Sequence, residues 1–313
     1  MTNQTLEMQK NRPTKIKKMS SKRTEERWFY LFISPWIIGF LCFILGPIIA
    51  SFFLSFTNWD LFTPAKWVGL ENYQNLMQDK IFWKTVYNTF YFALISVPLT
   101  MILSLGMAYL LAHKMRGMSF FRTIFYLPAL VPIVASSMIF KFILAPDTGV
   151  INRFLAFFGI DGPAWLLDPT WVKMSFIFLA IWGVGANMVL LLAAIQGVPE
   201  ELYESADMDG ASKFKKFIHI TIPIISPVIF FNLIMGIIGS LQAFSQIYIL
   251  TGGGPNNASN MMVPYLFSNA FEFYKMGYAS SIAWVLFLII IIFTVIVFKS
   301  SSMWVYYESE VKK

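Results

Sequence analysis

The segment VPEELYESADMDGASKFKKFIHITIP, residues 198–223, is a short charged stretch between two long runs that carry no charged residue. The run on its N-terminal side covers residues 174–199, and the run on its C-terminal side covers residues 220–271. About 20 apolar residues are enough for a helix to span the hydrocarbon core of a bilayer. The segment is therefore predicted to connect two membrane-spanning helices.

The composition of the whole chain agrees with this interpretation. Of its 313 residues, 57% are hydrophobic and 13% are charged, whereas soluble domains carry about 25% charged residues. These values argue against a soluble enzyme, a disordered chain and a nucleic-acid-binding protein, and they favour a polytopic membrane protein. The single Cys42 excludes an intramolecular disulfide, and two histidines, His113 and His219, offer little for a metal site, so no bound metal is predicted.

The remaining runs without charge or histidine cover residues 28–59, 85–112, 123–140 and 276–298. The long run 220–271 contains a glycine-rich turn at residues 251–257, which cannot continue a helix through lipid. Its last part, residues 261–271, is too short to span and is predicted to lie at the membrane interface. We therefore expect an all-α polytopic membrane protein with six transmembrane helices, at about 28–56, 85–113, 120–144, 172–196, 222–250 and 277–299.

Lysine and arginine are unevenly divided between the two sides of this arrangement. The side with both termini and the connection 198–221 has 17 of them and a net charge of +7, against 7 and a net charge of 0 on the other side. Because cytoplasmic loops are enriched in these residues, both termini are predicted to be cytoplasmic, in tails 1–27 and 301–313. The basic first tail is expected to meet anionic lipid rather than nucleic acid. Outer-side tryptophans are expected to anchor at the interface: Trp59, Trp67, Trp165 and Trp171.

The interior of the predicted spans contains no Asp, Glu or His, the residues that commonly form proton or ion relays in ion-driven transporters. Lys141 is the only cation expected near the membrane, so a neutral substrate is favoured over a phosphate ester. Sequence motifs of serine hydrolases, zinc proteases and nucleotide phosphate loops are absent. We therefore expect no enzymatic activity and no cofactor bound by this chain. If ATP drives transport, its site must lie on another chain.

The connection 198–221 is predicted to form two short helices joined by a turn. Pro199 suits the start of the first helix, and Leu202, Tyr203 and Ala206 form its apolar face. Gly210 stands where a helix C-terminal cap belongs, and Ser212 can cap the second helix. The alternative for this helix-turn-helix elbow is a simple amphipathic connection that rests on lipid headgroups.

The elbow also resembles a known signature. Its motifs Glu204-Ser205-Ala206 and Asp209-Gly210-Ala211, followed by Phe217, Ile220, Pro223 and Pro227, resemble the EAA loop of binding-protein-dependent ABC importer permeases of the maltose and glycerol-3-phosphate type. Ser205 and Ile222 depart from the pattern, and both are small changes on a docking face. Further similar segments lie at residues 69–73, 88–89, 250–255 and 277–280.

This resemblance implies the type I permease fold of ABC importers and a transporter of several subunits. The expected partners are a second homologous permease, two cytoplasmic ATPase subunits that bind ATP and Mg, an extracellular or periplasmic solute-binding protein, and a sugar, which we expect to be an oligosaccharide. The elbow would be the coupling helix that docks on the ATPase, in a bacterial inner membrane. Its contact residues would be Leu202, Tyr203, Glu204, Ala206, Asp209, Gly210 and Ala211.

Polar and small side chains in the fourth and fifth predicted spans are candidates for the substrate path, because polar groups inside the bilayer are costly. Asn187 and Ser240 are the strongest of them, since the resemblance suggests that these spans face the cavity. The full set of candidates is Trp182, Asn187, Gly236, Ser240, Gln242, Ala243, Phe244 and Gln246.

Spacing predicts two faces on the fifth span: one with Gly236, Ser240 and Ala243, and one with Gln242 and Gln246. The same residues could instead serve helix packing and interhelical hydrogen bonding. Three other functions stay open on the sequence alone: a permease for another small solute such as glycerol-3-phosphate, an ion-coupled secondary transporter, and a membrane enzyme or assembly factor without a visible catalytic cluster.

Overall fold

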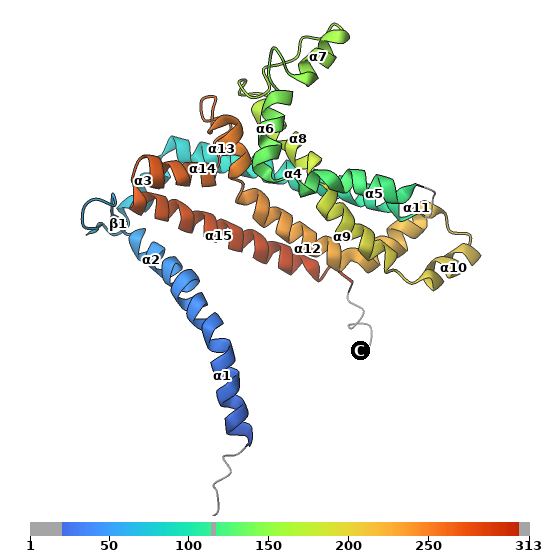
Figure 1. Ribbon diagram of the computed structural model, residues 1–313, viewed down its shortest axis with the longest axis horizontal. Coiled ribbons are helices and arrows are strands. Elements are labelled where there is room, and N and C mark those ends of the chain that lie inside the picture. The colour runs from blue at the N-terminus through green and yellow to red at the C-terminus, as the bar shows by residue number, and fades with distance from the viewer. Residues whose placement is uncertain (1–20, 114–116, 307–313) are drawn as a thin grey trace, which may run out of the picture. The chain divides into compact units, whose positions relative to one another are not determined.

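The computed structural model describes residues 21–113 and 117–306, with side chains from residue 25 onward (Figure 1). These residues divide into two compact units, one ending at Phe53 and the other beginning at Leu54. Each unit is described by itself. Most of the two predicted tails, residues 1–20 and 307–313, lies outside the described residues.

The first unit is one long helix. It consists of α1 (Ser21–Gly39), a π-helical turn η1 (Phe40–Leu45) and α2 (Gly46–Leu54), whose last residue, Leu54, begins the second unit. Its part Glu25–Leu54 has a mean hydropathy of 2.6, and no residue described in it is buried within the chain. An apolar helix of this length without protein cover needs a membrane or another apolar surface around it.

The second unit begins with a short hairpin and continues as a helical bundle. The strands pair antiparallel, Thr57 opposite Trp67 and Asn58 opposite Lys66. Its elements are β1 (Thr57–Asn58), β2 (Lys66–Trp67), α3 (Glu71–Gln78), α4 (Lys80–Ala112), α5 (Met118–Tyr126), η2 (Leu127–Leu130), α6 (Ile133–Ile143), α7 (Val150–Phe157), α8 (Val172–Trp182), α9 (Gly185–Gln196), α10 (Glu200–Met208), α11 (Lys213–Lys216), η3 (Phe217–Thr221), α12 (Ile222–Leu241), α13 (Ser245–Thr251), α14 (Met262–Phe267), η4 (Ser268–Glu272) and α15 (Met276–Ser301).

Among the described residues, four helices are long and apolar enough to cross a membrane: Glu25–Leu54, Lys80–Ala112, Lys213–Leu241 and Met276–Ser301. Two bent helix pairs pass the same test together. The pair α5–η2 and α6 bends by 97°, and the pair α8 and α9 bends by 43°. The structure therefore contains four to six candidate spans, and the exact number six stays a prediction.

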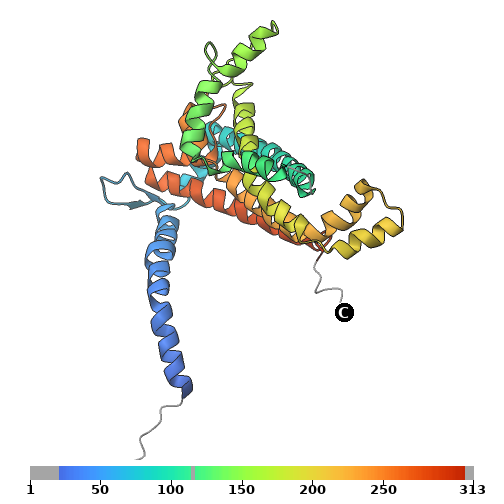
Figure 2. The ribbon, with the colours of Figure 1, turned by 45° about the vertical axis from the view of Figure 1, so that its right-hand side comes forward.

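Helix α4 organises the bundle, because it packs against α8, α9 and α12. Side chains from these helices form two apolar clusters along α4, one around Phe92 and Phe176 and one around Ala108 and Met188. A third cluster joins α4 to α14 and α15. Figures 1 and 2 show that, within this unit, α10 and α11 lie at one end and α3 with the strands at the other.

Two local features differ from the sequence-based expectation, whereas the placement of residues 261–271 at the membrane interface stays a prediction. The predicted fifth span at 222–250 is divided, because α12 ends at Leu241 and the chain turns before α13. Residues 261–271 form α14 and η4 and pack on α15 and α4, and Met262 is fully buried there. Trp165 is no interfacial anchor, because it is only 7% exposed and its indole Nε1 donates a 2.6 Å hydrogen bond to Asn152.

Candidate functional site

A polar cleft lies where α4, α8, α9, α12 and α13 meet. Its volume is about 220 Å³, and its walls are mostly small, hydroxyl and amide side chains. The lining residues are Phe92, Ser96, Val97, Thr100, Ala180, Gly183, Val184, Asn187, Gly236, Gly239, Ser240 and Gln246. Four of the predicted path residues thus come together in one cleft: Asn187, Gly236, Ser240 and Gln246.

The other four predicted residues lie elsewhere. Trp182 packs edge-on against Phe140 in the apolar core, with ring centroids 5.5 Å apart. Gln242 is exposed at the end of α12, and Ala243 is buried in the same core as Trp182. Phe244 stacks on Tyr248. The predicted shared faces are wrong for Ala243 and Gln242, because the helix ends before Ala243 and does not continue from Gln242 to Gln246.

Sequence reasoning missed the contribution of α4 to this cleft. Phe92, Ser96 and Thr100 follow each other at a spacing of four, so they share one face of the helix. Within this row, Thr100 Oγ1 donates to the Ser96 carbonyl of its own helix at 2.7 Å. The spacing of Ser96 and Thr100 within an apolar run was the available signal.

The bend between α8 and α9 is held by a close approach of two backbones. A Cβ atom on Gly185 would overlap the Phe125 carbonyl of α5, so only glycine fits there. On the neighbouring α4, the Ser104 hydroxyl lies 3.3 Å from the carbonyl of Val184. The bend at residues 183–185 places Asn187, four residues after Gly183, on the cleft wall.

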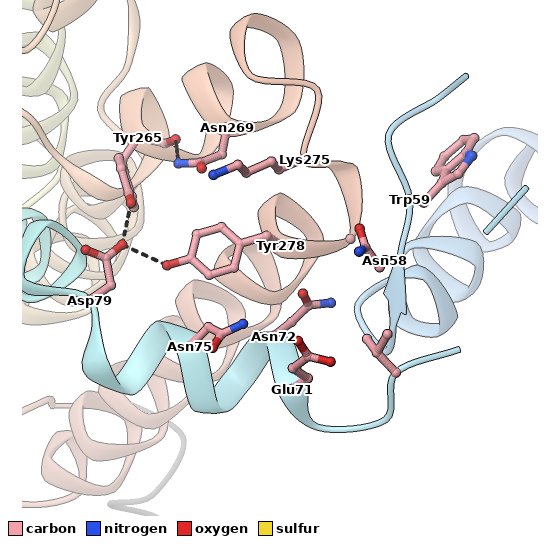
Figure 3. Close-up of a pocket in the computed structure, with 12 residues that line it drawn as sticks. Asn58, Trp59, Glu71, Asn72, Asn75, Asp79, Tyr265, Asn269, Lys275 and Tyr278 are labelled. Atoms are coloured by element: carbon pink, nitrogen blue, oxygen red, sulfur yellow. Dashed lines mark hydrogen bonds between the residues drawn. The ribbon is translucent and has the colours of Figure 1, made fainter. Parts of the chain in front are cut away.

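A second polar pocket of about 440 Å³ lies at the N-terminal end of α4, between α3, α14, α15 and the strand β1 (Figure 3). Asp79, the N-cap of α4, accepts hydrogen bonds from the Tyr265 hydroxyl and, at 2.8 Å, from the Tyr278 hydroxyl. On the far wall, Asn72 donates to the carbonyls of Ser55 and Thr57, both at 2.9 Å. Figure 3 shows the Asp79 carboxylate turned toward both tyrosines.

The electrostatics of this pocket follow from those contacts. Burial raises the pKa of Asp79, but hydrogen bonds from Tyr265, Tyr278 and backbone amides outweigh it, so the pKa lies below its usual value. Burial and the neighbouring Asp79 carboxylate raise the pKa of Tyr265 to about 12. Asp79 therefore stays ionised and Tyr265 protonated at neutral pH. Within the described residues, no group of three or more His, Cys, Asp or Glu side chains could hold a metal ion.

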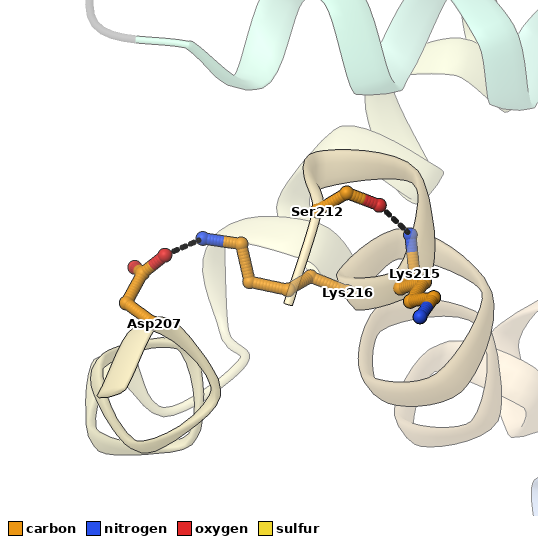
Figure 4. A network of polar contacts seen from close by, with 4 residues as sticks. All are labelled: Asp207, Ser212, Lys215 and Lys216. Carbon is orange, nitrogen blue, oxygen red and sulfur yellow. Dashed lines mark hydrogen bonds and ion pairs between the residues drawn. The ribbon is translucent and has the colours of Figure 1, made fainter. Parts of the chain in front are cut away.

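The predicted elbow is confirmed for the first helix, α10, and the turn after it (Figure 4). The second predicted short helix is not separate, because α11 continues through η3 into α12 as one helix, Lys213–Leu241. Gly210 follows α10 with a φ of +72°, a left-handed conformation that favours glycine. Ser212 caps α11, with its hydroxyl 3.4 Å from the Lys215 amide. An ion pair of 2.7 Å between Lys216 and Asp207 joins the two helices.

The predicted contact residues of the elbow fall into two groups. Tyr203 turns toward the bundle, where its hydroxyl lies 2.8 Å from that of Thr221 and its ring packs on the apolar cluster around Met188. Leu202 is 42% exposed. Glu204, Asp209 and Gly210 are also exposed, while Ala206 and Ala211 are half-buried. Met208, which sequence reasoning did not select, is 89% exposed at the end of α10.

These features together define a helical membrane protein with a polar cleft between its spans and a projecting loop of two helices. The family described as "Binding-protein-dependent transport system inner membrane component" matches residues 120–307. The chain belongs to this family and is a multi-pass inner-membrane permease component of such a transport system.

Known proteins agree with this assignment. The "Probable ABC transporter permease protein YesP" of Bacillus subtilis (strain 168) is 41% identical over 94% of this chain and 97% of its own length. The "Trehalose/maltose transport system permease protein MalF" of Thermococcus litoralis is 33% identical over 89% of this chain and 95% of its own. A chain from a bacterial ABC transporter for import of the acidic polysaccharide alginate is 26% identical. It has a TM-score of 0.79 and covers 90% of this chain and 98% of its own.

Proposed function

We propose that this chain is a permease subunit of an ATP-driven sugar importer and that the cleft between α4, α9 and α12 is part of the sugar path. The observation that carries the proposal is the chemistry of the cleft, whose polar groups are hydroxyls and amides without charge. Such groups match sugar hydroxyls, which both donate and accept hydrogen bonds. The names of relatives support a saccharide substrate, because MalF is a trehalose and maltose permease.

The proposal includes the topology and the partners. Six spans with both termini in the cytoplasm would place the elbow on the cytoplasmic side, where two ATPase subunits bind ATP and Mg. This chain itself would bind no cofactor and catalyse no reaction. A second permease would complete the path, and an external solute-binding protein would deliver the sugar to the end of the unit that carries α3 and the strands.

In this arrangement the elbow couples ATP use to movement of the spans. Leu202, Glu204 and Met208 offer exposed contacts to the ATPase. Movement of α10 would reach the spans through two contacts. Tyr203 joins α10 to Thr221, directly before α12, and the Lys216–Asp207 ion pair joins α10 to α11.

The path is tested by uptake of labelled sugar in cells that carry Asn187→Ala together with Ser240→Ala. Loss of two hydrogen-bonding groups should weaken apparent affinity about tenfold or more. Gln242→Ala is the matched control, since Gln242 is exposed and lies outside the cleft. Unchanged uptake and affinity in the double variant would refute the placement of the path.

The coupling role is tested by Gly210→Asp in the purified transporter. We expect substrate-stimulated ATPase activity to be abolished while membrane insertion persists. Gly159→Asp is the matched control, because Gly159 also has a positive φ of 73° and open space around it but lies outside the elbow. Normal transport by Gly210→Asp would rule out coupling through the elbow.

A further inference from the structure

Lys173 occupies an unusual place for a cation. It lies in the first turn of α8, inside a helix pair that is apolar enough to cross a membrane, and its side chain is half-buried. Its Nζ atom lies 4.9 Å from the ring centroid of Tyr87 and 4.6 Å from that of Tyr91. The Asn88 Oδ1 atom is 3.5 Å away. The expectation that Lys141 is the only cation near the membrane is therefore wrong.

A second lysine lies in the same region. Lys84, one turn before Asn88 on α4, donates a 2.6 Å hydrogen bond to the carbonyl of Asn256. The charges of Lys84 and Lys173 repel each other. In the part of the chain that the structure describes, no carboxylate lies within 4.0 Å of either ammonium group. Partial burial of the Lys173 ammonium without an acidic partner costs free energy, so the fold keeps here a positive charge that no described carboxylate neutralises.

The two lysines lie on α4 and α8, two helices that also supply residues to the polar cleft. Asn88 precedes Phe92, Ser96 and Thr100 at the same spacing of four, so all four residues lie on one face of α4. On α8, Lys173 lies seven residues, two turns, before the cleft residue Ala180. The rise along α4 from Asn88 to Ser96 is about 12 Å. A ligand longer than one sugar ring could thus contact Lys173 and the cleft together.

The aromatic rings favour a saccharide at this place. Tyr87 is 59% exposed, so its ring is open to a ligand as well as to Lys173. Asn88 is held in place because its Nδ2 atom donates to the carbonyls of Asn257 at 3.0 Å and Asn260 at 2.8 Å. The ammonium group of Lys173 is therefore positioned by two rings and a fixed amide oxygen. It retains donors for an anionic group, with which hydrogen bonds are short and strong.

We propose that Lys173, assisted by Lys84, binds a carboxylate of the sugar at the mouth of the cleft, so that the transported substrate is an acidic oligosaccharide. This inference rests on the proposed function and makes its substrate class specific. The cleft recognises hydroxyl groups, and the lysine pair selects sugars that carry an acid over neutral sugars of the same length.

The test uses the whole transporter, both permeases with ATPase and binding protein, in proteoliposomes. Substrates are tri- to pentasaccharides of uronic acids, each compared with its carboxyl-reduced neutral counterpart. Lys173→Met keeps a long apolar stem between the tyrosine rings and removes the charge. We expect uptake of the acidic saccharide to fall about tenfold or more, uptake of the neutral one to stay unchanged, and Lys173→Arg to retain acidic uptake. Lys141→Met is the control and should change neither.

The outcomes distinguish failure of this inference from failure of the proposed sugar-importer function. Wild-type transport of the neutral saccharides alone would overturn the inference and leave the sugar-importer function standing. Equal loss of both saccharides in Lys173→Met would mean that Lys173 has a structural or lipid-anchoring role, which also overturns it. Absence of uptake for every saccharide in the wild type would contradict the proposed function and the inference with it.

Discussion

The two ends of the unit that begins at Leu54 are held by different means. At the end with α3 and the strands, single polar side chains join segments that are far apart in the sequence. Asp79 accepts from Tyr265 and Tyr278, and Asn88 donates to two carbonyls of the loop before α14. At the elbow end, one ion pair joins α10 to α11, and its Asp207 side chain is 62% exposed.

Both ends expose apolar side chains: in the hairpin of the first end, Phe62 is 76% exposed and Trp67 is 67% exposed. Met262 and Ile282, near the first end, are fully buried. At the elbow, Met208 is 89% exposed and Phe214 is 72% exposed. The first end combines a pocket whose polar groups are bonded within the chain with exposed hairpin side chains. At the elbow the exposed apolar residues lie on a projecting loop, which suits a surface completed by another protein. The comparison predicts that substitutions at the first end change stability, whereas substitutions at the elbow change coupling.

The largest expected effect is that of Gly277→Ala in α15. A Cβ atom there would overlap the Thr57 carbonyl, which also accepts from Asn72, so the strand must move away from the helix. We expect a loss of about 3 kcal/mol in stability, measured by thermal unfolding of the purified chain in detergent. Gly106→Ala in α4 is the control, because nothing lies within 4 Å of its added Cβ. Equal melting of both variants would contradict a tight approach of α15 to β1.

The next largest effect is expected for Asp79→Asn, which removes the negative charge of the carboxylate that accepts hydrogen bonds from the Tyr265 and Tyr278 hydroxyls. The expected loss is about 2 kcal/mol at neutral pH. Because the folded pKa of Asp79 lies below its unfolded value, the wild type keeps this stability above about pH 4 and loses it as the pH falls through the folded pKa. The difference between wild type and variant should therefore shrink in acid. A constant difference from pH 7 to pH 3 would contradict this account.

A smaller effect is expected for Tyr203→Phe, which alters an inward contact of α10. It removes the hydrogen bond with Thr221, which is only 2% exposed, and should cost about 1 kcal/mol. Substrate-stimulated ATPase activity should fall as well, because the phenol joins α10 to the helix that continues into α12. A variant with normal stability and normal stimulation would show that this contact transmits nothing.

The smallest effect on stability is expected for Met208→Ala. Its side chain is 89% exposed, so we expect the free energy of unfolding to change by less than about 0.5 kcal/mol, with a correspondingly small shift in the melting temperature. ATPase stimulation in the assembled transporter should nevertheless decrease, since an exposed apolar side chain at a docking surface contributes to binding. Unimpaired stimulation would remove Met208 from the contact surface and weaken the contrast between the two ends.

Local signals in the sequence anticipated the elbow well. Gly210 adopts the left-handed conformation, and Ser212 caps α11, because capping depends on residues within a few positions of each other. Asn187 and Ser240, which the cost of placing polar groups in an apolar run makes candidates, lie together in one cleft. Their role in transport stays a prediction.

Other features of the site had no local signal. The helix ends between α12 and α13 although residues 242–244 contain no glycine or proline. Gln242 and Ala243 therefore do not lie on the helical faces predicted for them. Trp165 is buried on Asn152 rather than placed at an interface. These outcomes depend on packing between segments that are distant in the sequence.

The sequence by itself determined that this is a helical membrane protein with a charged elbow, because hydropathy, charge and capping act over short distances, and the elbow resembles the EAA loop of ABC importers. Only the tertiary structure brought Ser96 and Thr100 of α4 into one cleft with Asn187 and put the Lys173 ammonium over the rings of Tyr87 and Tyr91. The physical reason is that a binding site is made by side chains from several helices, whose relative rotation and bends are set by packing.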